Sequence, residues 1–189
     1  KNIFGSGSLY GPLQPIVVSA RKKQESQHSV PVNVFTIQQD QLESYNIQNL
    51  VDASEIVPNV NIHHGGAGNG SFLYIRGIGS SSISAAFDQS VALNIDGAVL
   101  NRGRFIHNSY LDTKQIEILK GPQALYFGKS ATAGVISLFT NDPSSEKELS
   151  ITTGLEPMHK GSFIELILSG PLTQTLGTRF AFGYSKQAE

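Results

Sequence analysis

Glycine-rich segments are the first places in this sequence where residue types and spacing could do chemistry, because glycine loops can cradle phosphate groups. Residues 66–71 read GAGNGS, so a serine stands where a dinucleotide-binding loop has its third glycine. Gly121 and Gly128 are placed somewhat like the two ends of a Walker loop, but six residues separate them and that loop has only four. Neither segment predicts a nucleotide site.

Side chains for covalent or metal chemistry are also poorly placed. The chain has no cysteine, which removes disulfides, thiolate ligands and cysteine nucleophiles, and it has no Gly-x-Ser-x-Gly elbow. His63 and His64 are neighbours, and adjacent residues of a strand point to opposite faces. The carboxylates are scattered, with no pair that fits one cleft. We therefore expect no enzymatic activity, no cofactor and no metal site.

Composition narrows the class of protein. The chain of 189 residues carries 14 Lys and Arg against 15 Asp and Glu, whereas a nucleic-acid binder would show a basic surplus. We therefore expect no nucleic-acid partner. Charged residues make up 15%, compared with about 25% in ordinary soluble domains. No apolar run approaches the ~18 residues of a membrane-spanning helix.

The elements that must position any site fall into regions of different character. Residues 1–14 are rich in Gly, Ser and Pro without periodicity, which predicts a flexible tail. Residues 28–142 predict a mixed α/β domain, in which a helix over 48–57 ends at Pro58. Its expected strands are 32–37, 60–62, 72–76, 91–95, 116–120 and 134–140, and its long polar loops are 63–71, 77–90 and 97–110. Loops this long usually serve a function.

The pattern changes after Pro143. Residues 148–189 predict about three alternating strands, over 149–155, 164–169 and 178–184. In the last of these, Phe180 and Phe182 share one face with Tyr184, and small or polar residues occupy the other. This alternation is typical of the wall of a membrane β-barrel, and equally of any antiparallel sheet with one wet face.

A short apolar patch stands alone near the N-terminus, within residues 15–21. It consists of Ile16, Val17, Val18, Ser19 and Ala20, between the tail and a polar run over 21–29. Two interpretations remain open from the residues alone. The patch is either the first strand of the following domain or a short linear motif that adds to the sheet edge of a partner.

Residues 116–140, which read IEILKGPQALYFGKSATAGVISLFT, resemble the signature of the plug domain of TonB-dependent outer-membrane receptors. Four further segments resemble motifs of this family and occur in the same order along the chain. They are the helix and turn at 50–60, Ile-Arg-Gly at 75–77, the Val-to-Asp-Gly strand and turn at 91–97, and Gly-Pro-Leu at 170–172. The resemblance covers about residues 15–185. Ala133, Lys120 and Phe127 depart from the usual pattern, as subfamily variation does.

The resemblance implies an α+β plug domain with a mixed sheet, followed by the first antiparallel strands of a transmembrane β-barrel that is incomplete here. It places the protein in the bacterial outer membrane, with the plug inside the barrel and the N-terminus in the periplasm. The resemblance also implies a set of structural motif residues, and the glycines among them equally fit ordinary turns. The set is Gly77, Asp96, Gly97, Gly121, Pro122, Tyr126, Gly128 and Gly134.

The resemblance also assigns roles to three groups of residues. Ile16 to Ala20 resemble the TonB box, which pairs with the periplasmic domain of TonB by strand addition. Arg76 and Lys120 would lock the plug to barrel carboxylates, although Lys120 also fits a solvated lysine at a strand end. The candidate ligand-facing residues, each of which also fits an ordinary loop residue, are Phe87, Arg102, Arg104, Phe105 and Tyr110.

The function implied by the resemblance is TonB-dependent active transport of a scarce ligand across the outer membrane, most often a small iron–siderophore complex. The partners would be TonB with its inner-membrane energising complex, the ligand and outer-membrane lipid. Uptake of a vitamin or a glycan is an alternative. A signal-transducing receptor of the same fold is a further alternative. It would need an extra folded domain before the TonB box, and only some 15 residues precede the box here, which disfavours this alternative unless such a domain precedes this sequence. A free periplasmic binding module would have no use for the strands after Leu149.

Overall fold

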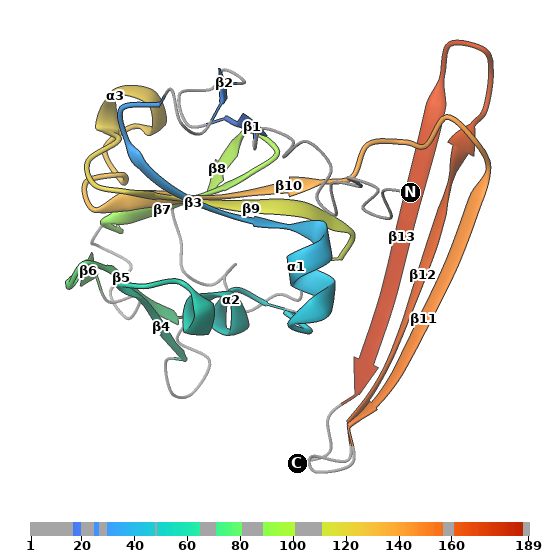
Figure 1. The fold of residues 1–189 in the computed structure, drawn as a ribbon, viewed down its shortest axis with the longest axis horizontal. Helices are drawn as coiled ribbons and strands as arrows, with labels where there is room; N and C mark the ends of the chain where they lie inside the picture. The colour runs from blue at the N-terminus through green and yellow to red at the C-terminus, as the bar shows by residue number, and fades with distance from the viewer. Residues whose placement is uncertain are drawn as a thin grey trace, which may run out of the picture.

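The computed structural model describes residues 17–19, 25–26, 30–47, 49–64, 71–80, 89–100, 111–156 and 161–186. A five-stranded sheet of order β3-β9-β10-β7-β8 forms the centre of the fold (Figure 1). Its strands are β3 (Asn33–Gln38), β7 (Val91–Ile95), β8 (Ala98–Leu100), β9 (Thr113–Lys120) and β10 (Gly134–Thr140). β10 pairs in parallel with β7, and the other pairs are antiparallel. The expected mixed sheet is confirmed.

Two short helices and a second sheet cover one side of this central sheet (Figure 1). Helix α1 spans Gln39–Ser44, and helix α2 spans Leu50–Ile56. The second sheet, of order β4-β5-β6, consists of β4 (Val60–His64), β5 (Ser71–Ile75) and β6 (Ile78–Ser80). Asn49 caps α2, because its side chain accepts hydrogen bonds from the N–H groups of Val51 and Asp52 at 2.8 and 3.1 Å.

The two faces of the central sheet differ in polarity. Towards the helices, the buried residues are Ile37, Ile116, Ile118, Ile136, Leu138 and Leu93, and they join the main core. On the opposite face, an apolar row crosses the sheet through Val34, Leu119, Val135 and Ala92. Beside it runs a buried polar row of register partners, Thr36, Glu117, Ser137 and Asn94. Alternation along each strand places both rows on this face.

The N-terminal patch lies against the apolar row of that opposite face. Strand β1 (Val17–Val18) pairs antiparallel with β2 (Glu25–Ser26), as a two-stranded ladder apart from the central sheet. Val18 is fully buried among the residues of the apolar row. A short helix, α3 (Ala124–Phe127), adds Phe127 to the same cluster. The sequence pattern does not predict this helix, because its single turn is too short to show a period of 3.6 residues.

Three long strands form a separate antiparallel sheet beside the plug, which we call the wall (Figure 1). They are β11 (Glu148–Glu156), β12 (Gly161–Pro171) and β13 (Gly177–Lys186). Large apolar side chains are exposed along the wall, namely Leu149, Ile151, Leu155, Phe180, Phe182 and Tyr184. The wall is an open sheet within the described ranges, as expected for the first strands of a barrel.

Across the described ranges, no helix combines the length and the apolar character that crossing a membrane requires.

Candidate functional site

The N-terminal patch, Ile16 to Ala20, is the candidate segment for coupling to TonB, and we call it the candidate coupling segment. Side-chain and backbone contacts together hold its described part on the plug. Val18 is fully buried, whereas Val17 is 44% exposed. The backbone N–H of Ser19 donates to both carboxylate oxygens of Glu117, at 2.8 and 3.0 Å. The described part of the patch, Val17 to Ser19, therefore packs as a strand of the plug. Ile16 and Ala20, the other two residues expected in this segment, lie outside the described residues.

Glu117 is a fully buried carboxylate in the middle of the central sheet. Its register partners on β3 and β10 are Thr36 and Ser137, and the side-chain amide of Gln115 donates to it at 2.7 Å. Burial raises the pKa of Glu117 from 4.5 to about 7, although the hydrogen bonds from Ser19 and Gln115 oppose that rise. Sequence reasoning did not single out Glu117, although an acid flanked by Ile116 and Ile118 in the expected strand was a signal that could have found it.

The two basic residues expected to lock the plug lie close to each other near the start of β4. Lys120 is only 8% exposed, so it is not a solvated lysine. Its ammonium donates to the carbonyl oxygen of Pro58 at 2.6 Å and lies 5.5 Å from the ring centroid of Phe35. Burial lowers the pKa of Lys120, and the positive charge of Arg76 lowers it further. Arg76 is exposed at a turn with φ 54°.

Within the part of the chain that the structure describes, neither Arg76 nor Lys120 meets a carboxylate of the wall. A different pair joins the plug to the wall. Arg179 of β13 holds the carboxylate of Asp112 through two nitrogen atoms, with Nη2 2.7 Å from Oδ1 and Nε on the other oxygen. The side chains are 12% and 7% exposed, so the pair is largely withdrawn from water.

Further contacts make Asp112 and Arg179 the centre of a small network, which we call the Asp112 network. The side-chain amide of Asn141 donates to the Asp112 carboxylate at 2.9 Å. Arg179 Nη1 also reaches Ser144 Oγ and Glu148 Oε2, each at 3.3 Å. The network therefore ties together the turn before β9, the connection after β10 and two strands of the wall. Sequence reasoning missed it, because Arg179 showed only as a polar residue on one face of an alternating strand.

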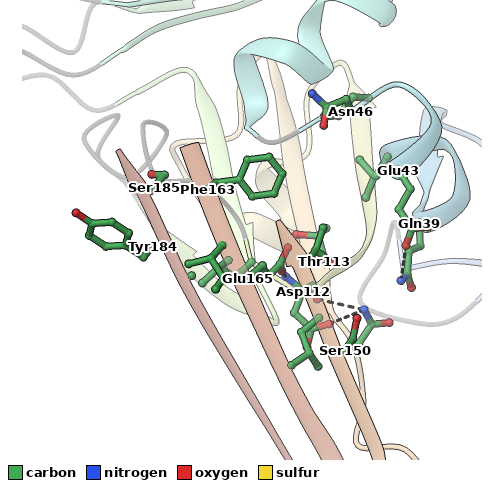
Figure 2. A pocket seen from close by; sticks show the side chains of 18 of the residues that line it. Gln39, Glu43, Asn46, Asp112, Thr113, Ser150, Phe163, Glu165, Tyr184 and Ser185 are labelled. Atoms are coloured by element: carbon green, nitrogen blue, oxygen red, sulfur yellow. Dashed lines mark hydrogen bonds between the residues drawn. The ribbon is translucent and has the colours of Figure 1, made fainter. Parts of the chain in front are cut away.

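A cavity of about 710 Å³ separates α1 from the wall next to this network (Figure 2). Polar side chains line much of it, including Gln39 and Glu43 from α1, Asn46 just after that helix, and Ser150 and Glu165 from the wall. The Asp112 N–H points to Glu165 Oε1 at 3.4 Å. The Leu111 side chain packs against Gly183 of β13 at the same place, so the plug contacts this part of the wall through both the Asp112 network and Leu111.

The residues of the sequence signature sit at turns around the central sheet. Asp96 and Gly97 form the turn between β7 and β8, and the Asp96 carboxylate accepts hydrogen bonds from the N–H and hydroxyl of Thr140, both at 2.9 Å. Gly134 lies where a Cβ atom would come within 2.4 Å of the Leu119 carbonyl oxygen. Gly77, Gly121 and Gly128 have positive φ. Pro122, which precedes α3, and Tyr126, which lies within it, are both exposed.

The candidate ligand-facing residues are not placed by the structure. Phe87, Arg102, Arg104, Phe105 and Tyr110 all lie outside the described residues. Within the described ranges, no three His, Asp or Glu side chains converge in the way that a metal site requires.

Known proteins resemble this chain in sequence. The family model described as TonB-dependent Receptor Plug Domain matches residues 26–135. A pesticin receptor of Yersinia enterocolitica is 26% identical over 186 residues, which cover 89% of this chain and 27% of that receptor. The vitamin B12 transporter BtuB of Vibrio vulnificus is 25% identical over 140 residues, which cover 74% of this chain and 22% of the transporter. The chain spans about a quarter of the length of these relatives.

Solved structures share the fold. The ferric yersiniabactin uptake receptor FyuA from Yersinia pestis superposes with a TM-score of 0.72 at 24% identity, over 82% of this chain and 24% of that one. The pyoverdine outer membrane receptor FpvA from Pseudomonas aeruginosa PAO1 superposes with a TM-score of 0.76 at 17% identity. The superposition covers 90% of this chain and 24% of that one. The expected outer-membrane localisation is confirmed by these relationships. The family model covers more than half of the chain, and the chain therefore belongs to the family of TonB-dependent receptor plug domains.

Proposed function

We propose that the protein containing this chain carries out TonB-dependent active transport of a scarce ligand across the outer membrane. In this proposal, residues 28–142 are the plug, residues 148–189 begin the barrel and residues 15–21 form the TonB box. The periplasmic domain of TonB, together with its inner-membrane energising complex, would pull on that box. Strand addition needs mainly backbone hydrogen bonds, which suits the plain apolar character of Val17 and Val18.

One observation carries the proposal, namely that the two faces of the wall meet different surroundings. Arg179 reaches inward from β13 to the carboxylate of Asp112 on the plug. Successive residues of a strand point to opposite faces, so Phe180 and Phe182 lie on the face away from Arg179. Their side chains are 69% and 61% exposed. An apolar outer face and a polar inner face that holds a plug suit a barrel wall in lipid.

The ligand that we favour is a ferric siderophore. FyuA is described as a ferric yersiniabactin uptake receptor, and FpvA as a pyoverdine receptor. A vitamin is the second candidate, because one relative is a vitamin B12 transporter. Phe87, Arg102, Arg104, Phe105 and Tyr110 remain our candidates for ligand contacts. Arg76 and Lys120 remain candidates for a lock with carboxylates on barrel strands after residue 186.

The ligand class can be tested with the full-length protein in cells that lack other uptake systems for the compounds tested. Such cells would be supplied with ferric siderophores of catecholate, hydroxamate and mixed types, with cobalamin and with an oligosaccharide, each labelled. We expect energy-dependent accumulation of one ferric siderophore class at nanomolar concentrations. Accumulation of cobalamin or the oligosaccharide alone would replace the siderophore assignment, and accumulation of none would contradict the transport proposal.

A further inference from the structure

The backbone of the candidate coupling segment is already engaged inside the chain. Val17 and Val18 pair with Ser26 and Glu25 of β2. The next N–H along the segment, that of Ser19, donates to Glu117. A partner that adds a strand to this segment would use backbone groups of the same kind and in the same place. Docking on the plug and pairing with a partner are therefore competing states of Val17–Ser19.

Glu117 is unusual among the residues that face this segment. The sheet face beneath it has an apolar row, which receives Val18, and a polar row, in which Glu117 carries the single ionisable side chain among the four register partners. A buried carboxylate is unfavourable unless donors surround it. Glu117 has two donors in the described structure, the Gln115 amide on its own strand and the Ser19 N–H on the segment.

We propose that Glu117 is a positioning residue that latches the N-terminal segment to the plug, so that Val17–Ser19 become available to a partner only after the Ser19–Glu117 contact breaks. The proposal rests on the function proposed above, in which this segment couples the plug to TonB. The latch grips backbone and not side chain, so it restrains the same atoms that strand addition needs. Val18 sets the position of the segment, and Glu117 holds the N–H that follows it.

A cysteine reporter measures the latch directly. This chain has no cysteine, and Ser19→Cys keeps the backbone N–H that donates to Glu117. The full-length protein, with any other cysteine replaced, would carry S19C in isolated outer membranes without TonB. The rate of maleimide labelling at pH 6.5 then reports how often the segment leaves the plug.

Three substitutions separate the latch from a general disturbance of the sheet. E117M removes both acceptor oxygens, and E117Q keeps one of them in place. T36V changes the neighbouring buried position of the same polar row, and its hydroxyl has no partner among the described residues. We expect E117M to raise the labelling rate about tenfold or more, as the loss of a buried hydrogen bond implies. The labelling rate of E117Q should stay within about threefold of the rate of the parent, and T36V should label at the same rate as the parent.

The outcomes are decisive in either direction. If E117M labels no faster than T36V, the latch does not exist. If E117M does not assemble in the membrane, E117D replaces it, because a side chain one methylene shorter withdraws the carboxylate from Ser19. Faster labelling of E117D then supports the latch, and labelling at the parent rate overturns it.

A parallel measurement keeps this inference separate from the proposed function. The same membranes would be incubated with the purified periplasmic domain of TonB, and bound TonB would be quantified. Faster labelling of E117M with no TonB binding by any variant would support the latch and contradict the TonB-box assignment. TonB binding by the parent protein with equal labelling of all variants would support the TonB-box assignment and contradict the latch.

Discussion

Arg179 of the wall and Asp112 of the plug form a two-point ion pair with little access to water. The arginine comes from the wall and the acid from the plug, which is the opposite of the arrangement expected for Arg76 and Lys120. The pair lies beside the connection from β10 to β11, where the plug passes into the wall. Pulling on the N-terminal segment would therefore load the plug while its far end stays attached.

The first prediction concerns this pair. R179Q leaves the Asp112 carboxylate in place with only Asn141 as a side-chain donor, and we expect it to lower the free energy of unfolding of the plug by about 2–4 kcal/mol. D112N combined with R179Q should recover part of that loss, because the uncompensated charge is gone. Chemical denaturation of the purified full-length protein, followed by a probe in the plug, measures both.

A matched control for that prediction is the exposed ion pair between Lys114 and Asp142. Lys114 Nζ lies 2.9 Å from Asp142 Oδ2, and the two side chains are 51% and 83% exposed. D142N should change the free energy of unfolding by less than about 1 kcal/mol, because water and salt screen such pairs. Equal effects of R179Q and D142N would show that the Asp112 network does not fasten the plug.

The second prediction concerns energy coupling. V17P or V18P removes a backbone donor from the segment and restricts its backbone, so that it can no longer add as a strand. We expect either variant to abolish transport while ligand binding at the cell surface remains intact. V17A serves as the control, since it changes an exposed side chain without changing the backbone. Full uptake by V18P would show that this segment is not the TonB box.

The third prediction concerns pH. Burial raises the pKa of the Glu117 carboxyl from 4.5 to about 7, so the folded plug binds this proton more tightly than the unfolded chain does. The corresponding contribution to the stability of the plug is complete below about pH 4.5 and is lost as the pH rises through about 7. Its neighbours across the sheet, Thr36 and Ser137, and Gln115 on its own strand carry no charge.

We therefore expect the free energy of unfolding of the plug to fall between pH 6 and 8 in the parent protein relative to E117Q, where no proton is exchanged. Chemical denaturation of both full-length proteins over this range measures the change, and the difference between them removes the pH dependence of other groups. A difference that stays constant, or that grows in favour of the parent, would contradict the assigned role of burial at Glu117.

The fourth prediction concerns the close approach at Gly134. An added Cβ would lie 2.4 Å from the Leu119 carbonyl oxygen, which belongs to backbone and cannot move aside cheaply. G134A should destabilise the plug by about 2–3 kcal/mol. At Gly121 nothing lies within 4 Å of the added atom, although φ is 111°. G121A should therefore have the smaller effect, and a larger effect of G121A would contradict this explanation.

The sequence was informative where structure depends on neighbours along the chain. Alternation predicted the long strands β9 to β13, and Pro58 marked the end of α2, because both signals act over a few residues. The Asp112 network escaped prediction, since Arg179 and Asp112 are 67 residues apart and no local pattern links them. The Ser19–Glu117 contact spans 98 residues and escaped for the same reason.

The sequence left two interpretations open for the N-terminal patch, a strand of the following domain or a linear motif for a partner. The structure shows Val17 and Val18 as a strand with Val18 buried in the plug. The second interpretation remains a proposal, because a segment that docks in one state can pair with a partner in another. Composition cannot separate these states, since both use the same apolar side chains and the same backbone groups.

The central claim is that TonB drives transport through this protein. The most direct measurement is accumulation of a labelled ferric siderophore by cells that contain the full-length protein, with and without TonB. We predict binding to both kinds of cell and accumulation only in cells with TonB. Equal accumulation in cells without TonB would contradict the account.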